Sequence, residues 1–195
     1  MSRLLRLALA LGLVAALALV VAACGDDDDD NGDSGGEELV LTGEDTTLAL
    51  DETLAGVLQE NGVTVEPIRP ATASDAGITF PITAGVINSE SLAGTINHAG
   101  GLRFSADGEE VEVTDFEINT NNATLTATSG GDQLPLLGIN LDGLARSSDG
   151  DVILLEGVTT TLVPEAAVAL NDALGVVFFS EGTDVGEVTI RASTS

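Results

Sequence analysis

The chain has 195 residues, a formal net charge of −26 and 44% hydrophobic residues, which suits one folded domain with additional terminal segments. It contains 32 acidic residues against six arginines and no lysine, and so negative a surface repels nucleic-acid phosphates and anionic lipid head groups. With a single cysteine and a single histidine, the sequence offers no intramolecular disulfide and little acid–base machinery, so we expect no enzyme.

Residues 1–23 predict a lipoprotein signal peptide. Arg3 and Arg6 precede an unbroken apolar run that ends directly before Cys24. The segment Val21-Ala22-Ala23-Cys24 resembles the bacterial lipobox, in which the cysteine is acylated after cleavage. The alternative is an uncleaved transmembrane anchor, but the run falls just short of the roughly 20 residues that span a bilayer. We expect lipidation at Cys24 and a lipid-anchored protein on the extracytoplasmic face of the cell membrane.

Residues 24–38 predict an acidic, disordered tether. The sequence GDDDDDNGDSGG is highly charged and has no apolar side chain to bury. A pattern that starts at Asp27 matches the spacing of an EF-hand calcium loop but lacks flanking helices, and GDSGG matches a protease serine segment but lacks a preceding histidine. We therefore predict neither a metal site nor a catalytic serine in this segment.

Residues 39–195 predict one β-rich domain, because short alternating apolar runs are separated by Gly, Asn, Asp and Ser. We expect a mainly β fold, an antiparallel β-sandwich-like domain with two short α-helices. Hairpin turns are predicted at residues 97–101, 106–109 and 119–122, and an exposed turn at 144–151. The predicted strands are Leu39–Thr42, Thr47–Leu50, Val63–Glu66, Ile78–Ile82, Ala93–Asn97, Leu102–Ser105, Val111–Ile118, Ala123–Thr128, Leu134–Ile139, Val152–Leu155, Thr159–Val163, Val176–Phe179 and Val185–Arg191.

Two segments carry helical signals within this β pattern. Residues 51–61 place leucine and valine at helical spacing, with Asp51 as the N-terminal cap and Gly62 at the end. Residues 164–174 begin with Pro164, carry an Ala/Val/Leu face and stop at Gly175. We expect the two helices to lie near each other, at an end or an edge of the β-sandwich.

The middle of this domain resembles a known family. The segments GITFPITAG from Gly77, GTINHAGGL from Gly94, ATLTA from Ala123 and PEAAVALN from Pro164 look like the haem-transport-associated (HtaA-type) domain of actinobacterial envelope proteins. The resemblance covers about residues 45–191. It implies a β-sandwich-like domain at the cell surface and, for some members, capture of haem.

The sequence departs from this family at the haem ligand. Haem-binding members ligate iron through a tyrosine, and this chain has none. His98 is therefore the remaining candidate haem ligand, although a histidine in a Gly-rich turn commonly faces solvent or bonds to the backbone. Arg103 is a second candidate ligand-binding residue; the alternation of Leu102, Arg103 and Phe104 predicts that it points away from both neighbours, and an ion pair with an acid is its other interpretation.

Two function classes remain open. The first is an envelope module that binds a ligand or a protein partner, with haem as one candidate ligand and no other cofactor. The second is a structural or adhesive envelope protein, stabilised by cations through acidic turns such as the one at residues 107–110.

Overall fold

A computed structural model describes residues 35–195. The predicted signal peptide, Cys24 and residues 24–34 of the predicted tether lie outside the described residues. Residues 35–195 form one compact unit with a single continuous core, the features of a domain that folds on its own. Neither helix in this part of the chain is long and apolar enough to cross a membrane.

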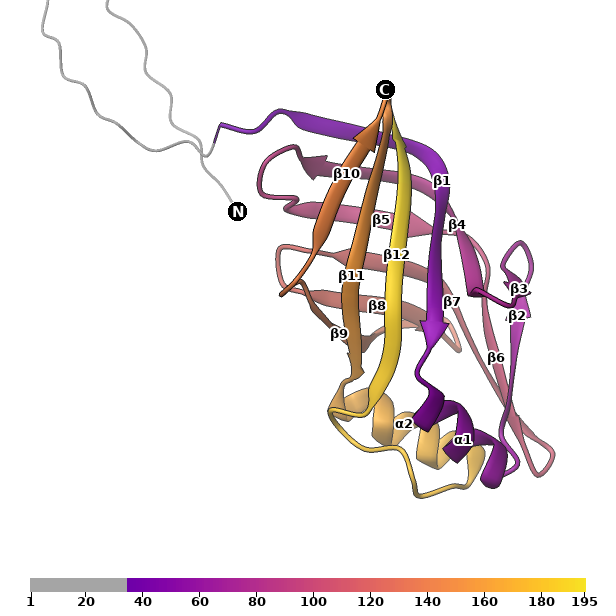
Figure 1. Cartoon of the computed structure of the whole chain (residues 1–195). Coiled ribbons are helices and arrows are strands. Elements are labelled where there is room, and N and C mark those ends of the chain that lie inside the picture. The colour runs from indigo at the N-terminus through magenta and orange to yellow at the C-terminus, as the bar shows by residue number, and fades with distance from the viewer. Residues whose placement is uncertain (1–34) are drawn as a thin grey trace, which may run out of the picture. The chain divides into compact units, whose positions relative to one another are not determined.

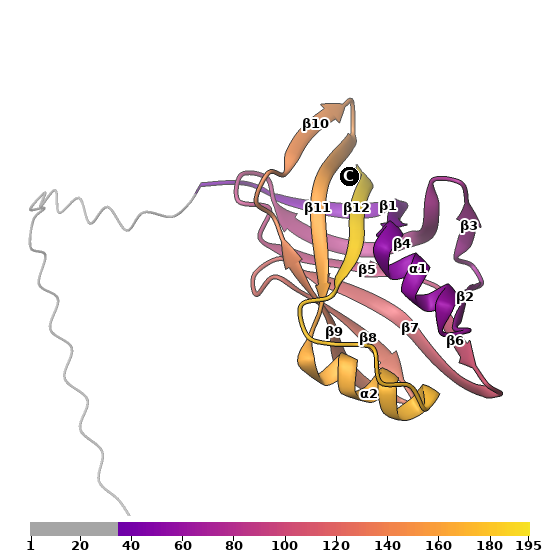
Figure 2. The same cartoon turned by 60° about the horizontal axis from the view of Figure 1, so that its bottom comes forward.

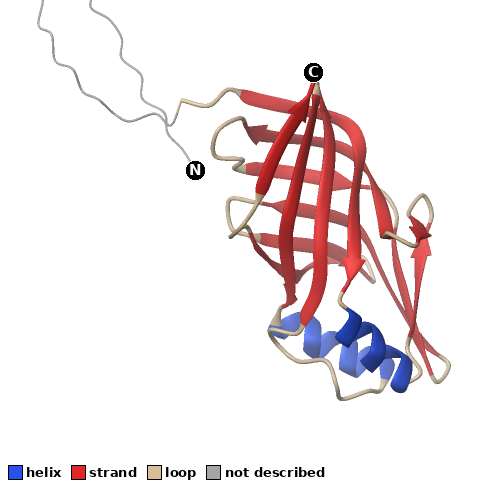
Figure 3. Cartoon of the chain, viewed as in Figure 1, coloured by secondary structure: helices blue, strands red, loops and turns tan. Residues whose placement is uncertain are grey.

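The described residues form two helices and an extensive antiparallel sheet, coloured blue and red in Figure 3. The helices are α1 (Glu52–Glu60) and α2 (Pro164–Leu174). The strands are β1 (Glu38–Leu50), β2 (Thr64–Ile68), β3 (Thr72–Ser74), β4 (Gly77–Asn88), β5 (Gly94–His98), β6 (Gly101–Ala106), β7 (Glu109–Asn119), β8 (Thr124–Ser129), β9 (Asp132–Asn140), β10 (Ala145–Asp149), β11 (Val152–Leu162) and β12 (Asp184–Thr194).

Eight of these strands close on themselves into a barrel-like sheet, in the order β7, β5, β4, β1, β12, β11, β9 and β8. The closure arises because β8 pairs with β7 as well as with β9. The remaining strands extend the wall: β6 and β2 continue from β7, β3 pairs with β4, and β10 pairs with β11. The prediction of a mainly β, antiparallel fold with two helices is confirmed. The two layers of the expected sandwich are opposite walls of one closed sheet.

Both helices lie at one end of the closed sheet, opposite the end at which β1 begins (Figures 1 and 2). Asp51 caps α1, since its side chain accepts hydrogen bonds from the backbone N–H groups of Thr53 at 2.9 Å and Leu54 at 3.0 Å. α2 begins at Pro164 and ends at Gly175, whose φ of 66° is left-handed. The predicted helices and their position at an end of the sheet are confirmed.

Several predicted strands are parts of longer ones. The runs at 39–42 and 47–50 belong to the single strand β1, which is irregular near Gly43 and Glu44, where Glu44 has a φ of 76°. The runs at 152–155 and 159–163 likewise join in β11. Within the predicted exposed turn at 144–151, residues 145–149 form the exposed strand β10, which makes a hairpin with β11.

The predicted hairpin turn at residues 97–101 is wrong. β5 and β6 do not pair with each other; both pair with β7, so the chain continues in one direction through Ala99 and Gly100. Glycine is required at position 100 because the backbone passes close to Ala71. Gly100 has a φ of 90°, and a Cβ there would lie 2.7 Å from the backbone nitrogen of Ala71. His98, two residues before Gly100, is the last residue of β5 and is buried, with 5% exposure.

The predicted strand at residues 176–179 is also wrong. This segment belongs to the loop between α2 and β12, although it is rich in β-forming residues. The side chain of Asn171 in α2 takes the place of a neighbouring strand: its Oδ1 accepts a hydrogen bond from Phe179 N at 3.1 Å, and its Nδ2 donates one to Phe179 O at 2.8 Å. Val177 projects into solvent with 94% exposure.

Candidate functional site

The domain contains an interior cavity of about 90 Å³ between the two helices and the inner face of the sheet. Leu54 and Leu58 of α1, Leu170 of α2 and side chains from the surrounding strands line it. The lining is almost wholly apolar; its polar side chains are Thr46, His98 and Thr183. Because protein interiors hold few voids larger than a water molecule, this cavity is the candidate ligand site.

His98 lies in the wall of this cavity and both of its ring nitrogens have partners. Nδ1 lies 3.1 Å from the carbonyl oxygen of Phe116, and Nε2 lies 2.7 Å from Oγ1 of Thr46. A carbonyl oxygen only accepts, so Nδ1 carries the proton and donates it. Nε2 therefore presents its lone pair to the hydroxyl of Thr46, which donates. The same nitrogen would have to leave this hydroxyl before it could bind a metal.

The buried imidazole is neutral over most of the pH range. Burial lowers the pKa of His98 from 6.5 to about 4, and the hydrogen bond to the Phe116 backbone partly opposes this shift. A charged imidazolium in an apolar cavity would lack water, so the protonated form is disfavoured. The interior cavity therefore contains a neutral hydrogen-bonding pair, Thr46 and His98, and no fixed charge.

Thr46 is the site residue that the sequence analysis missed. It belongs to β1 and His98 to β5, and β4 lies between these two strands. The signal was present in the alternation of β1, since Thr46 shares the inward face with the buried Leu48. The alternation does not reveal how β1, β4 and β5 are aligned with one another. This alignment brings Thr46 and His98, 52 positions apart, into hydrogen-bonding distance.

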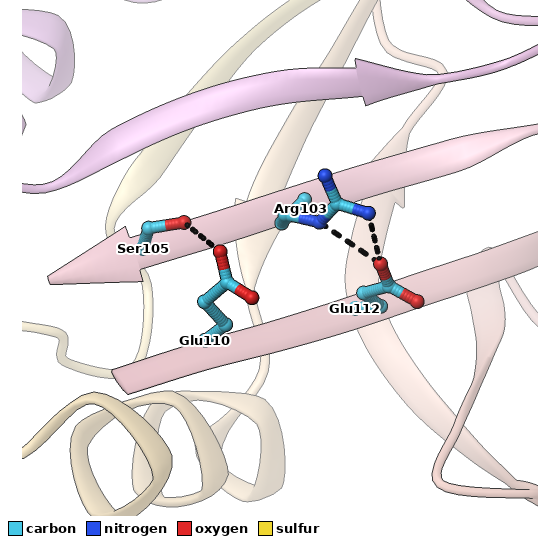
Figure 4. Close-up of polar contacts among 4 residues, drawn as sticks. All are labelled: Arg103, Ser105, Glu110 and Glu112. Carbon is cyan, nitrogen blue, oxygen red and sulfur yellow. Dashed lines mark hydrogen bonds and ion pairs between the residues drawn. The ribbon is translucent and has the colours of Figure 1, made fainter. Parts of the chain in front are cut away.

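Arg103 lies on the outer surface and outside the interior cavity. Leu102 and Phe104 line the cavity while the Arg103 side chain, 40% exposed, pairs with Glu112 on the neighbouring strand β7 (Figure 4). Its Nε and Nη2 donate to the same carboxylate oxygen at 2.9 and 2.6 Å. This partner raises the pKa of Arg103 above its ordinary value. The structure thus places the two candidate residues on opposite sides of the wall.

A second hollow, which we call the surface pocket, has a volume of about 250 Å³ and lies beside α1. It is lined by residues at the start of α1 and in the loop that leads to β12. These residues are Asp51, Thr53, Leu54, Val57, Phe178, Phe179, Thr183 and Asp184.

The acidic side chains of residues 35–195 do not converge on a metal site. No group of three or more His, Cys, Asp or Glu side chains in this part of the chain is arranged to hold an ion. The acidic turn at residues 107–110 connects β6 and β7 as a hairpin, as its sequence predicts.

Comparisons with solved structures identify the fold. The C-terminal domain of HtaA from Corynebacterium glutamicum matches with a TM-score of 0.60 at 15% identity, over 80% of this chain and 99% of that domain. The N-terminal domain of the same protein matches with a TM-score of 0.58 at 16% identity, over 79% and 99% of the two chains.

A third match is the heme-binding protein HtaB of the same organism, with a TM-score of 0.55 at 14% identity, over 83% of this chain and 98% of that one. No family model matches the sequence, and no curated protein matches it. The likeness therefore concerns the arrangement of the backbone and extends over nearly the whole of each solved domain. Residues 35–195 have the fold of an HtaA-type domain.

Proposed function

We propose that this chain is an exported lipoprotein, anchored through Cys24 on the extracytoplasmic face of the cell membrane, whose β domain binds an apolar ligand. The interior cavity is the observation that carries the proposal. At about 24 cal/mol per Å³, an empty cavity of about 90 Å³ costs the fold about 2 kcal/mol, which a bound apolar group would recover. The Thr46–His98 pair supplies the polar feature by which such a site orients a ligand.

A small apolar probe tests the binding proposal directly. Cavities of roughly 150 Å³ with aliphatic and aromatic walls bind benzene or xenon, so a cavity of about 90 Å³ should admit xenon and, with side-chain adjustment, benzene. Binding should raise the melting temperature with increasing probe concentration and shift the NMR signals of Leu54, Leu170 and His98. Unchanged melting and unchanged signals at saturating probe would contradict the proposal.

Haem is the specific ligand that the fold comparison favours, since HtaB is a heme-binding protein. Three features of this chain stand against it in the described state: the sequence has no tyrosine, Nε2 of His98 is bonded to Thr46, and the cavity is far below the roughly 300 Å³ of the smallest drug-sized pockets. Haem binding would require the helices to move outward and the Thr46 hydroxyl to turn away.

Titration with haemin tests haem as the ligand. If haem binds, the titration should give a Soret shift that His98→Ala abolishes, whereas a flat titration removes haem as the ligand.

Lipid anchoring is tested separately from ligand binding. Mass spectrometry of the native protein should find an N-terminal acylated Cys24, as the lipobox predicts. An intact leader with an unmodified thiol would contradict the export proposal and would leave the cavity argument unaffected.

A further inference from the structure

The interior cavity and the surface pocket share a wall. Leu54, Phe179 and Thr183 line both hollows, so these three side chains face the interior on one side and the outside on the other. Taken together, the two volumes reach the lower end of the roughly 300–1,000 Å³ range of ligand sites. An elongated ligand that lies through this wall would fill both hollows.

Phe179 is the part of the wall whose side chain is held by packing alone. Both backbone groups of Phe179 are fixed by the Asn171 side chain, and Thr183 is fixed by its backbone carbonyl, which accepts from Leu162 N at 2.9 Å. The Phe179 ring, in contrast, is held by apolar packing, including contact with the Phe178 ring at a centroid distance of 4.3 Å. Opening this wall would therefore require the Phe179 ring, which is 7% exposed and belongs to the core, to change rotamer while the backbone hydrogen bonds stay in place.

The charges at the surface pocket select the head group of such a ligand. Its lining contains the carboxylates of Asp51 and Asp184 and no basic side chain. The arginines for which the structure gives polar contacts are engaged elsewhere: Arg103 with Glu112, Arg191 with Glu44 and Arg146 with the Ser89 carbonyl. Carboxylates at this rim repel an anionic head group and attract a cationic one.

We propose that the ligand is an alkyl chain with a cationic head group, which inserts its chain past Phe179 into the interior cavity and leaves its head at Asp51 and Asp184. This inference rests on the proposed binding function and deepens it. It names the chemical class of the ligand and the route by which the ligand reaches the cavity.

The experiment compares three probes of equal chain length: decyltrimethylammonium and decanoate below their micelle concentrations, and decan-1-ol below its solubility limit. Titration calorimetry of residues 35–195 at low salt should rank decyltrimethylammonium first, decan-1-ol second and decanoate last, with decyltrimethylammonium binding about tenfold or more tighter than decanoate. Added salt should reduce this ratio, because the carboxylates are exposed. Asp184→Asn should reduce it as well, while Glu181→Gln, in the loop just before β12 but outside the pocket lining, should leave it unchanged.

The route past Phe179 is tested by measuring association rates. Phe179→Ala should raise the association rate of decyltrimethylammonium by about tenfold, whereas Phe178→Ala, which removes an aromatic ring from the surface pocket alone, should change it little. If Phe179→Ala does not fold, Phe179→Leu retains a buried apolar side chain and should show the same effect in smaller measure.

The outcomes separate the inference from the function on which it rests. Equal binding of the three probes, or tighter binding of decanoate, overturns the cationic head group. Association rates that are the same in wild type and in the folded Phe179 variant overturn the route. Binding of benzene or xenon without binding of any decyl probe leaves the proposed function standing and removes this inference. Failure of every apolar probe removes the proposed function itself.

Discussion

Acid should destabilise this domain through His98. Its pKa is lowered to about 4 in the folded protein and returns to about 6.5 on unfolding. Between these values the unfolded state binds more protons than the folded state, so stability falls as the pH falls. The difference of about 2.5 units amounts to about 3 kcal/mol at 1.36 kcal/mol per unit, with about 2 kcal/mol already lost at pH 5.

The assay must separate the contribution of His98 from the effect of pH on the rest of the protein. His98→Gln keeps one donor and one acceptor but carries no charge at any pH, and it leaves every carboxylate in place. Urea unfolding of wild type and variant at pH 7, 5 and 4 gives the two free energies of unfolding as a function of pH. Their difference should change by about 3 kcal/mol between pH 7 and pH 4, with the wild type losing more.

An NMR titration of the His98 ring tests the lowered pKa directly. The imidazole carbon-bound protons of His98 should titrate in the folded protein well below pH 6.5. If the unfolding free energies of wild type and His98→Gln fall in parallel, or if the imidazole titrates near 6.5, the neutral, buried Thr46–His98 pair is not present in solution.

Three further changes have defined outcomes. Thr46→Val removes the hydroxyl that donates to Nε2 and should lower the free energy of unfolding by about 1–3 kcal/mol in urea, while Thr46→Ser should lower it less because it keeps the donor. Asp51→Ala should cost about 1 kcal/mol through loss of the α1 cap, and Asp51→Asn should retain most of that stability in the same assay. Val188→Ile adds a methylene at the wall of the interior cavity and should weaken xenon or benzene binding, measured by the ligand-induced rise in melting temperature, without loss of the fold.

Local sequence signals predict much of the secondary structure. Pro164 and Gly175 bracket α2, and Asp51 caps α1, because helix ends depend on a few residues in direct chain contact with the helix. The strand pattern likewise places most of the strands in the correct order. The errors at residues 176–179 and 97–101 have a different origin: Asn171 replaces a strand partner for Phe179, and Gly100 lies against Ala71. Both depend on a contact outside the local pattern.

The candidate site is less predictable than the fold, for the same reason. The sequence singles out His98 because it is the only histidine. It does not show that His98 faces an apolar cavity or that the Thr46 hydroxyl is bonded to its Nε2. Predicting either contact requires knowledge of how β1 is aligned with β4 and β4 with β5. The ion pair of Arg103 is more accessible to prediction, since β6 and β7 form a hairpin and Arg103 is the direct cross-strand partner of Glu112.

The strand that follows the proposed anchor has a mechanical consequence. β1 pairs along most of its length with β4 on one edge and β12 on the other, and the backbone N–H of Ser195 bonds to the carbonyl of Val40. Tension applied through the chain on the N-terminal side of Glu38 acts along the strand. When the opposing force acts at the far end of the domain, where the helices lie, it therefore loads two ladders of hydrogen bonds in shear at once, instead of peeling them apart one by one. A cell-surface protein attached at this end would resist forced extension, because rupture of many bonds together makes unfolding under load slow.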